Sequence, residues 1–219
     1  MKKKITVVFM GDSITDAGRD REKPTESFGN GYAAMVAAML RQRLPHIDFT
    51  FVNQGLNGNS TPQCAERWDA DVAAYDPDYV TLMVGVNDAY AFALNVLPEE
   101  LCAAAYRKKL DAMTAHALQG RLKKILFITP YYLGHKGEDL SAFFNGMMPD
   151  YMPPYRRAFK AVARKYGMPC LDPQQWFDKE RRIMDGKLIA TDYVHPTAYG
   201  HAIMALHVAD ALEQMIRAE

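Results

Sequence analysis

The sequence predicts an α/β fold in which one sheet of five parallel strands lies between two layers of helices. Short apolar runs rich in β-branched residues alternate with longer segments of helical period. That alternation is typical of a parallel sheet with both faces covered. The 219 residues are 49% hydrophobic and 24% charged, which allows a sizeable core without crosslinks. We therefore expect a single domain over residues 1–219, organised as a three-layer α/β/α sandwich.

The expected elements follow one another in strand–helix pairs. The strands are the short apolar runs, and the helices are the segments of helical period between them. The pairs are 5–10 with 32–44, 47–53 with 62–75, 79–84 with 99–118, 124–129 with 154–166, and 168–172 with 198–217. Pro98 before Glu99 and Gly120 after the third helix are the usual start and stop signals of a helix.

Segment 133–153 fits neither pattern. It is long for a connection and contains Gly, Met, Phe and two prolines. We expect it to be irregular, and three interpretations stay open: a lid over a site, an assembly surface, or a packed excursion over the sheet edge. The last is considered because Met and Phe clusters usually fill gaps.

Composition excludes several classes of protein. Lys+Arg and Asp+Glu both total 26, and no basic stripe with interleaved aromatic residues appears, so we expect no nucleic-acid partner. The apolar run after the three N-terminal lysines is short for a signal peptide and is expected to be the first strand, so we expect no membrane partner. Cys64, Cys102 and Cys170 are odd in number and widely spaced, which predicts neither disulfides nor a zinc site. A cytoplasmic location follows.

Polar loops follow the predicted strands. In an open parallel sheet, ligands bind outside the carboxyl ends of the strands. Residues 11–13 (Gly-Asp-Ser) follow the first strand, 53–59 the second and 85–88 the third, and 192–195 precede the last helix. We expect all four loops to converge on one rim.

The residues of these loops can be assembled into an acyl-transfer site. A serine hydroxyl is a poor nucleophile until an imidazole takes its proton, and Ser13 and His195 suit those two roles. Asp192, three residues before His195, can orient the ring and stabilise the imidazolium. An oxyanion requires preorganised donors. The candidates are the backbone N–H groups of Ser13 and Gly58 and the Asn87 amide, with Gly55 as the alternative glycine.

Each residue also has a purely structural interpretation. Ser13 could cap a loop, His195 could be the polar residue before a helix, and Asn87 could turn the chain after a strand. The four blocks taken together, in their order along the chain, favour the catalytic interpretation.

The chain resembles the SGNH hydrolases, also called GDSL esterases, over nearly its whole length. Ser13, Gly58, Asn87 and His195 match the four named blocks of that superfamily. The resemblance implies a flavodoxin-like SGNH hydrolase fold and serine chemistry without a metal or organic cofactor. The chain is most similar to intracellular bacterial acetylxylan esterases, which share the pattern GDSITDxGR, Arg-Trp at 67–68 and HPTxxGH at 195–201. That similarity implies deacetylation of short sugar esters by a homo-oligomer.

Two departures from the acetylxylan esterase type leave the substrate open. Segment 134–152 is longer and more apolar, and Thr191 precedes Asp192 where an aromatic platform is expected. The aromatic side chains near the site could stack on a pyranose, line an acyl pocket or belong to the core; they are Tyr90, Phe92, Tyr131 and Tyr132.

Three functions are therefore weighed. The first is a short-chain carbohydrate esterase. The second is a lysophospholipase or acyl thioesterase of the same superfamily, favoured if segment 133–153 forms an acyl channel. The third is a binding protein on an inactive hydrolase frame, which would require a broken Ser13, Asn87 or His195, and all three are present.

Two patterns that could indicate a cofactor or metal site lack the structural context that such a site requires. The glycines of residues 29–34 lie well beyond the first strand rather than at its immediate turn, which argues against a dinucleotide site. His201 and His207 are six residues apart on a predicted helix and so face different directions, without a cluster of ligands to complete a metal site. We expect both to be packing or surface residues.

Overall fold

A computed structural model describes residues 2–134 and 148–219 of the protein. Its sheet has five strands in the order β2-β1-β3-β4-β5, and every pairing is parallel. The strands are β1 (Lys3–Gly11), β2 (Ile47–Gly55), β3 (Tyr79–Met83), β4 (Lys124–Ile128) and β5 (Cys170–Leu171). The predicted α/β class and the predicted parallel sheet are confirmed.

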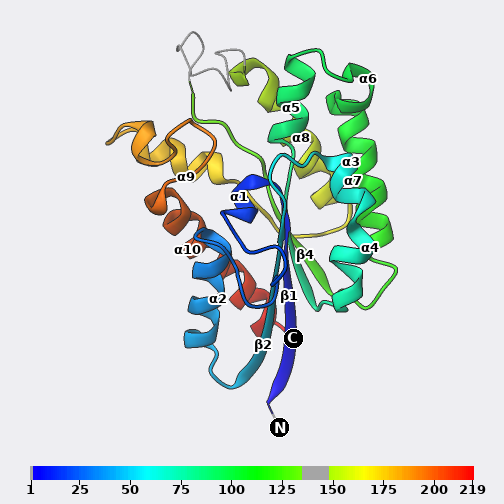
Figure 1. The fold of residues 1–219 in the computed structure, drawn as a ribbon, viewed down its shortest axis with the longest axis vertical. Helices are drawn as coiled ribbons and strands as arrows, with labels where there is room; N and C mark the ends of the chain where they lie inside the picture. Colours follow the sequence, from blue (N-terminus) through cyan, green and yellow to red (C-terminus); the bar gives the residue numbers. More distant parts are fainter. Residues whose placement is uncertain (1, 135–147) are drawn as a thin grey trace.

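Helices cover both faces of this sheet (Figure 1). One layer contains α2 (Tyr32–Arg43), α9 (Pro173–Glu180) and α10 (Ala198–Arg217). The other contains α3 (Thr61–Glu66), α4 (Trp68–Asp71), α5 (Val86–Ala93), α6 (Pro98–Leu101), α7 (Ala103–Ala117) and α8 (Met148–Lys165). Short α1 (Ser13–Asp16) lies at the carboxyl end of β1, and the 3₁₀ turns are η1 (Ala73–Tyr75) and η2 (Gly186–Leu188).

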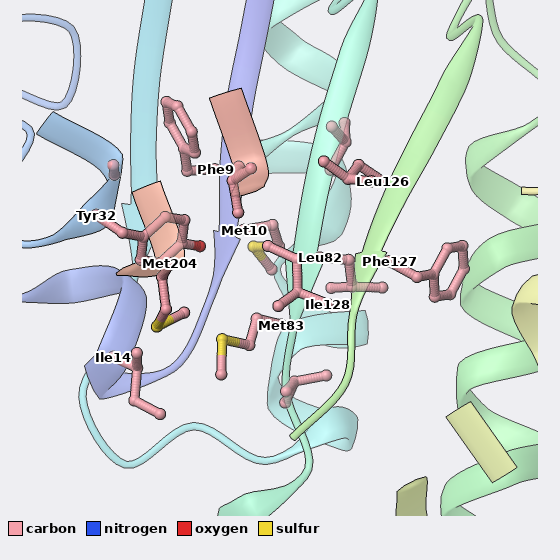
Figure 2. Close-up of a cluster of buried hydrophobic side chains, with 14 of the residues drawn as sticks. Phe9, Met10, Ile14, Tyr32, Leu82, Met83, Leu126, Phe127, Ile128 and Met204 are labelled. Carbon is pink, nitrogen blue, oxygen red and sulfur yellow. The ribbon is translucent and has the colours of Figure 1, made fainter. Parts of the chain in front are cut away.

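The core lies on both sides of the central strands (Figure 2). All five residues of β3 are buried, because helices remove both faces of the sheet from water. Phe9 of β1 packs edge-on against Tyr32 of α2, with ring centroids 6.1 Å apart. Phe127 of β4 packs against Phe159 of α8 at 5.2 Å, on the opposite face. This rigid sheet fixes where the loops at its carboxyl edge begin.

Two predicted helices are broken in the structure. The expected helix over 62–75 is divided into α3, α4 and η1, because the chain bends at Arg67, whose side chain binds backbone carbonyls of β1 and β2. The expected helix over 99–118 is divided into α6 and α7 at Cys102, which is extended with φ −60° and ψ 157°. The carbonyl of Leu101 there accepts a hydrogen bond from the Tyr155 hydroxyl at 2.5 Å, an acceptor satisfied from outside the helix.

Other predicted bounds are also wrong. Helix α8 begins at Met148 rather than at 154 and contains Pro153 and Pro154, so the expected irregular segment is wrong over 148–153. Met148, Met152 and Tyr155 are buried along one helical face, and this packing outweighs the local effect of the prolines. Residues 135–147 of that segment lie outside the described residues. The prediction missed α5 and α9, and β5 has two residues rather than five.

Among residues 2–134 and 148–219, no helix combines the length and hydropathy that a membrane crossing requires.

Candidate active site

The turn after β1 presents Ser13 at the carboxyl edge of the sheet. Asp12 caps α1, because its side-chain carboxylate accepts a hydrogen bond from the backbone N–H of Ile14 at 3.1 Å. Ser13 is then the first helical residue, and a backbone N–H at that position has no acceptor within its own helix. The local sequence thus leaves both the hydroxyl and the N–H of Ser13 available at the rim.

Ser13, His195 and Asp192 form one hydrogen-bonded chain. The Oγ of Ser13 lies 2.8 Å from Nε2 of His195, across 182 residues of sequence. The Nδ1 of His195 lies 2.6 Å from Oδ2 of Asp192. The other carboxylate oxygen of Asp192 accepts the backbone N–H groups of Val194 at 3.0 Å and His195 at 2.7 Å. The loop therefore holds the carboxylate beside Nδ1, which leaves Nε2 of a neutral ring as the acceptor facing Ser13.

Electrostatics favours an imidazole that accepts a proton. The hydrogen bond to Asp192 raises the pKa of His195 above its ordinary value, although partial burial acts against it. Burial by itself would raise the pKa of Asp192, but hydrogen bonds from the side chain and backbone of His195 outweigh it and hold that pKa low. Asp192 is therefore a carboxylate throughout the pH range in which the ring gains or loses its charge.

The three candidate oxyanion donors lie at the same rim. Gly58 has φ +80°, a left-handed conformation that suits glycine, and a Cβ placed there would meet no atom within 4 Å. Asn87 is the second residue of α5, and its Nδ2 donates to the carbonyl of Asn59 at 2.9 Å. That bond ties the Asn87 amide to the turn that carries Gly58, while an amide nitrogen has a second hydrogen to donate.

Gly55 occupies a different position from Gly58. It is the last residue of β2, and its N–H donates to the Asn53 side chain at 2.9 Å. A Cβ on Gly55 would lie 2.1 Å from the backbone nitrogen of Asp16, so a glycine here allows α1 to pack closely on β2. These contacts favour Gly58 over Gly55 as the oxyanion glycine.

Arg67 connects three parts of the rim. Its guanidinium donates to the carbonyl of Gly11 at 3.1 Å, to the carbonyl of Gln54 at 2.9 Å and to the Asn59 side chain at 2.7 Å, and it pairs with Asp71 at 2.6 Å. It thus holds the ends of β1 and β2 against the turn after Gly58. The sequence pattern marked Arg67 only as part of a motif, because its partners are backbone carbonyls brought close by the fold.

A cavity of about 760 Å³ opens above these groups. Most of its lining residues have polar or charged side chains; the lining consists of Ser13, Asp16, Gly18, Arg19, Arg21, Asn57, Gly58, Asn87, Tyr90, Asp192 and His195. Of the aromatic residues considered from the sequence, Tyr90 lines this cavity, whereas Tyr131 and Tyr132 are 0% and 4% exposed and belong to the core. Phe92 packs edge-on against Tyr151 at 5.9 Å.

Two buried carboxyl groups support the loops from below. Burial raises the pKa of Asp12 to about 6 and that of Asp88 to about 7. Both oxygens of Asp88 lie 3.0 Å from the backbone nitrogen of Thr61, which fixes the start of α3 beside α5. Sequence analysis gave neither acid a role, because nothing in the local pattern shows that these carboxyl groups are buried.

The remaining histidines of α10 have packing contacts. His201 is 7% exposed, and its Nδ1 accepts the backbone N–H of Tyr32 at 3.1 Å. His207 stacks on Trp176 with ring centroids 4.0 Å apart. Over residues 2–134 and 148–219, no group of three or more His, Cys, Asp or Glu side chains is arranged to hold a metal ion.

Comparison with known proteins identifies the family. Residues 9–203 match the GDSL-like lipase/acylhydrolase family. The chain belongs to this family. It is 31% identical over 204 residues to an acetylxylan esterase of Geobacillus stearothermophilus, covering 91% of this chain and 90% of the relative. This GDSL-family protein is accordingly a carboxylic ester hydrolase.

Solved structures agree with this assignment. A crystal structure of an α/β hydrolase enzyme from the metagenome of Lake Arreo, Spain, has a TM-score of 0.82 and 33% identity, covering 94% of this chain and 93% of that one. The acetylxylan esterase from Geobacillus stearothermophilus has a TM-score of 0.80 and 30% identity over 94% of this chain and 93% of that one. The predicted SGNH hydrolase fold is confirmed.

Proposed function

We propose that this GDSL-family hydrolase is a serine esterase that removes short acyl groups, chiefly acetyl, from carbohydrates. The hydrogen-bonded chain from Ser13 through His195 to Asp192, with links of 2.8 and 2.6 Å, carries the proposal. Solved structures of the Geobacillus acetylxylan esterase include catalytic mutants in which a serine, an aspartate or a histidine is replaced by alanine. The aspartate and histidine of that protein are three residues apart, as Asp192 and His195 are here.

Acylation begins with attack on the ester carbonyl. A bond forms between Oγ of Ser13 and the carbonyl carbon of the ester as the Oγ proton passes to Nε2 of His195. The electron pair of the carbonyl double bond moves onto its oxygen. Asp192 stabilises the imidazolium that results. When the tetrahedral intermediate collapses, the bond from carbon to the alcohol oxygen breaks. The leaving alcohol takes the proton from Nε2, and the acyl group remains on Ser13.

Deacylation repeats the sequence with water. Water attacks the acyl carbon while Nε2 of His195 accepts its proton. The bond from the acyl carbon to Oγ of Ser13 then breaks, Nε2 returns the proton to Oγ, and the acid is released. In both halves the oxyanion is stabilised by the N–H groups of Ser13 and Gly58 and by the Asn87 amide, which act best when they are held in place before charge develops.

Replacing Asn87 with alanine is expected to lower kcat by about two to three orders of magnitude, because one oxyanion donor is lost. Initial rates on 4-nitrophenyl acetate measure the effect. Asn95→Gly is the control, since Asn95 is exposed and has a φ of +58° that glycine adopts freely. An Asn87→Ala enzyme with wild-type kcat would exclude this donor from the mechanism.

The cavity supports a polyhydroxylated alcohol as the leaving group. Asp16, Arg19, Arg21 and Asn57 line it together with Tyr90, and such a mixture of donors, acceptors and one aromatic ring suits a sugar. The acetylxylan esterases that the chain is similar to have that substrate in their names.

We also propose that the enzyme works in the cytoplasm as a single-domain homo-oligomer without a metal or cofactor, with neither nucleic acid nor membrane as a partner.

A series of esters tests the substrate class. Purified enzyme is assayed with chelator present on 4-nitrophenyl acetate, butyrate and octanoate and on an acetylated xylo-oligosaccharide. We expect the highest kcat/KM on acetyl esters and acetate release from the oligosaccharide, unchanged by chelator. Rates that rise toward octanoate, without release of acetate from the oligosaccharide, would instead assign the enzyme to lysophospholipid or thioester hydrolysis.

A further inference from the structure

The pair Ser13 and His195 borders a second cavity besides the one described above. This cavity has a volume of about 380 Å³ and lies between α1, the loop after it and the start of α10. Its other lining residues are Ile14, Ala17, Asn30, Pro196, Ala198 and His201. In Figure 1, α1 lies with α2 and α10 on one side and α5 on the other. Both cavities border Ser13 and the residues of α1, but the first continues toward Gly58 and Asn87 and the second toward Pro196 and Ala198.

The second cavity differs from the first in polarity. The first contains Asp16, Arg19 and Arg21. In the second, His201 is uncharged at neutral pH, because burial lowers its pKa to about 4 and its Nδ1 accepts the backbone N–H of Tyr32. Apart from His201 and the catalytic pair, Asn30 is the one polar side chain among the lining residues that the structure describes.

We propose that this second cavity is the acyl subsite and that it takes a short, unbranched acyl group, from acetyl to butyryl. The ester carbon bonded to Ser13 carries two substituents besides its oxygen, and the two cavities offer each of them a separate place. Sugar hydroxyls in the apolar cavity would lose hydrogen bonds to water without replacement, whereas an alkyl chain gains by leaving water. The alcohol accordingly occupies the larger, polar cavity. This assignment rests on the proposed function of Ser13.

Two alanines set the size of the acyl subsite. Ala17 ends α1 with φ +43°, and its half-buried methyl group lines the cavity. Ala198 is the first residue of α10 and is exposed at the cavity. A larger side chain at either position occupies volume that an acyl chain would use. Asparagine suits position 17 because it tolerates the left-handed backbone.

Two substrate pairs separate the acyl side from the alcohol side. 4-Nitrophenyl butyrate and acetate differ only in the acyl group, whereas 1-naphthyl acetate and 4-nitrophenyl acetate differ only in the alcohol. We expect Ala198→Phe and Ala17→Asn each to lower the butyrate-to-acetate ratio of kcat/KM by about tenfold, since one methylene in an apolar pocket changes specificity by roughly that factor or more. The naphthyl-to-nitrophenyl ratio stays within about twofold of wild type. Tyr90→Ala, in the polar cavity, is expected to change the naphthyl-to-nitrophenyl ratio and to leave the butyrate-to-acetate ratio within about twofold of wild type.

The controls distinguish this proposal from the one on which it rests. Ala74→Phe places the same bulk at an exposed residue of η1 and is expected to change neither ratio. Thermal unfolding shows whether Ala198→Phe or Ala17→Asn has failed to fold. If one has, the butyrate-to-acetate ratio of the other variant tests the proposal. An unchanged butyrate-to-acetate ratio, or a fall in the naphthyl ratio instead, overturns the acyl subsite while leaving the serine mechanism intact. Hydrolysis that survives in Ser13→Ala overturns the serine mechanism itself.

Discussion

Replacing Ser13 with alanine is expected to lower kcat for 4-nitrophenyl acetate by about four to six orders of magnitude, since the loss of a catalytic nucleophile removes the covalent route altogether. The effect is this large because the residues act as a unit. Without Oγ, the ring of His195 has no hydroxyl within the present 2.8 Å to deprotonate. Residual activity reflects substrate binding and the oxyanion donors alone.

Ser27→Ala is the matched control for this variant. The Ser27 hydroxyl only accepts the backbone N–H of Asp20, at 2.8 Å, in the loop between α1 and α2. It should retain wild-type kcat, and both variants should unfold at nearly the wild-type temperature. A second readout is covalent labelling by a fluorophosphonate, which should modify the wild type and Ser27→Ala but leave Ser13→Ala unlabelled. Labelling of Ser13→Ala would mean that another nucleophile carries the reaction.

Replacing Asp192 with asparagine is expected to lower kcat by about four orders of magnitude. An asparagine amide can donate a hydrogen bond to Nδ1 of His195, which stabilises the tautomer with its proton on Nε2, facing Ser13. That tautomer cannot accept the proton of the hydroxyl. The rate should therefore fall even though the positions of Ser13 and His195 change little.

The same variant changes the pH dependence in a defined direction. In the proposed mechanism the neutral ring is the base, so kcat/KM is expected to rise as pH increases through the pKa of His195. Asp192 raises that pKa above the ordinary value of 6.5, so the acidic limb of the wild type lies above pH 6.5. Without the carboxylate the pKa falls, and the limb of Asp192→Asn moves to lower pH. A limb that stays in place would show that Asp192 does not set the charge of the ring.

Asp185→Asn is the control for Asp192→Asn. Asp185 is exposed, and its carboxylate accepts the backbone N–H of Lys187 at 2.9 Å, at the start of η2. Its loss removes the same charge a few residues from the active loop without touching His195. We expect both kcat and the acidic limb of Asp185→Asn to match the wild type.

The parallel sheet and the place of the candidate nucleophile after its first strand could be predicted from the sequence alone. Strand segments such as 79–84 can be predicted because both faces of a buried parallel strand are covered by helices. Every residue of such a strand is therefore expected to be apolar. The pairing of Asp192 with His195 could also be predicted, because the two residues are three positions apart in one turn. Oδ2 of Asp192 lies 2.6 Å from Nδ1 of His195. Local spacing encodes local geometry.

The bounds of several helices depend on contacts between segments that are distant in the sequence. Helix α8 continues through Pro153 and Pro154 because its apolar face packs on the core, and the expected helix over 62–75 is broken where Arg67 turns toward β1 and β2. Propensity and punctuation are weak beside such contacts. The helices α5 and α9 were missed for a different reason: each begins just after a strand and is too short to show a clear helical period in the sequence.

The arrangement of the candidate site depends on such distant contacts as well. The hydroxyl of Ser13 reaches His195 across 182 residues, and Arg67 reaches the carbonyl of Gly11 across 56. The division of space around Ser13 into a polar and an apolar cavity likewise depends on which loops the sheet brings together. A sequence specifies which chemical groups are available, but contacts between distant segments form only when the buried sheet sets the position of every loop at its edge.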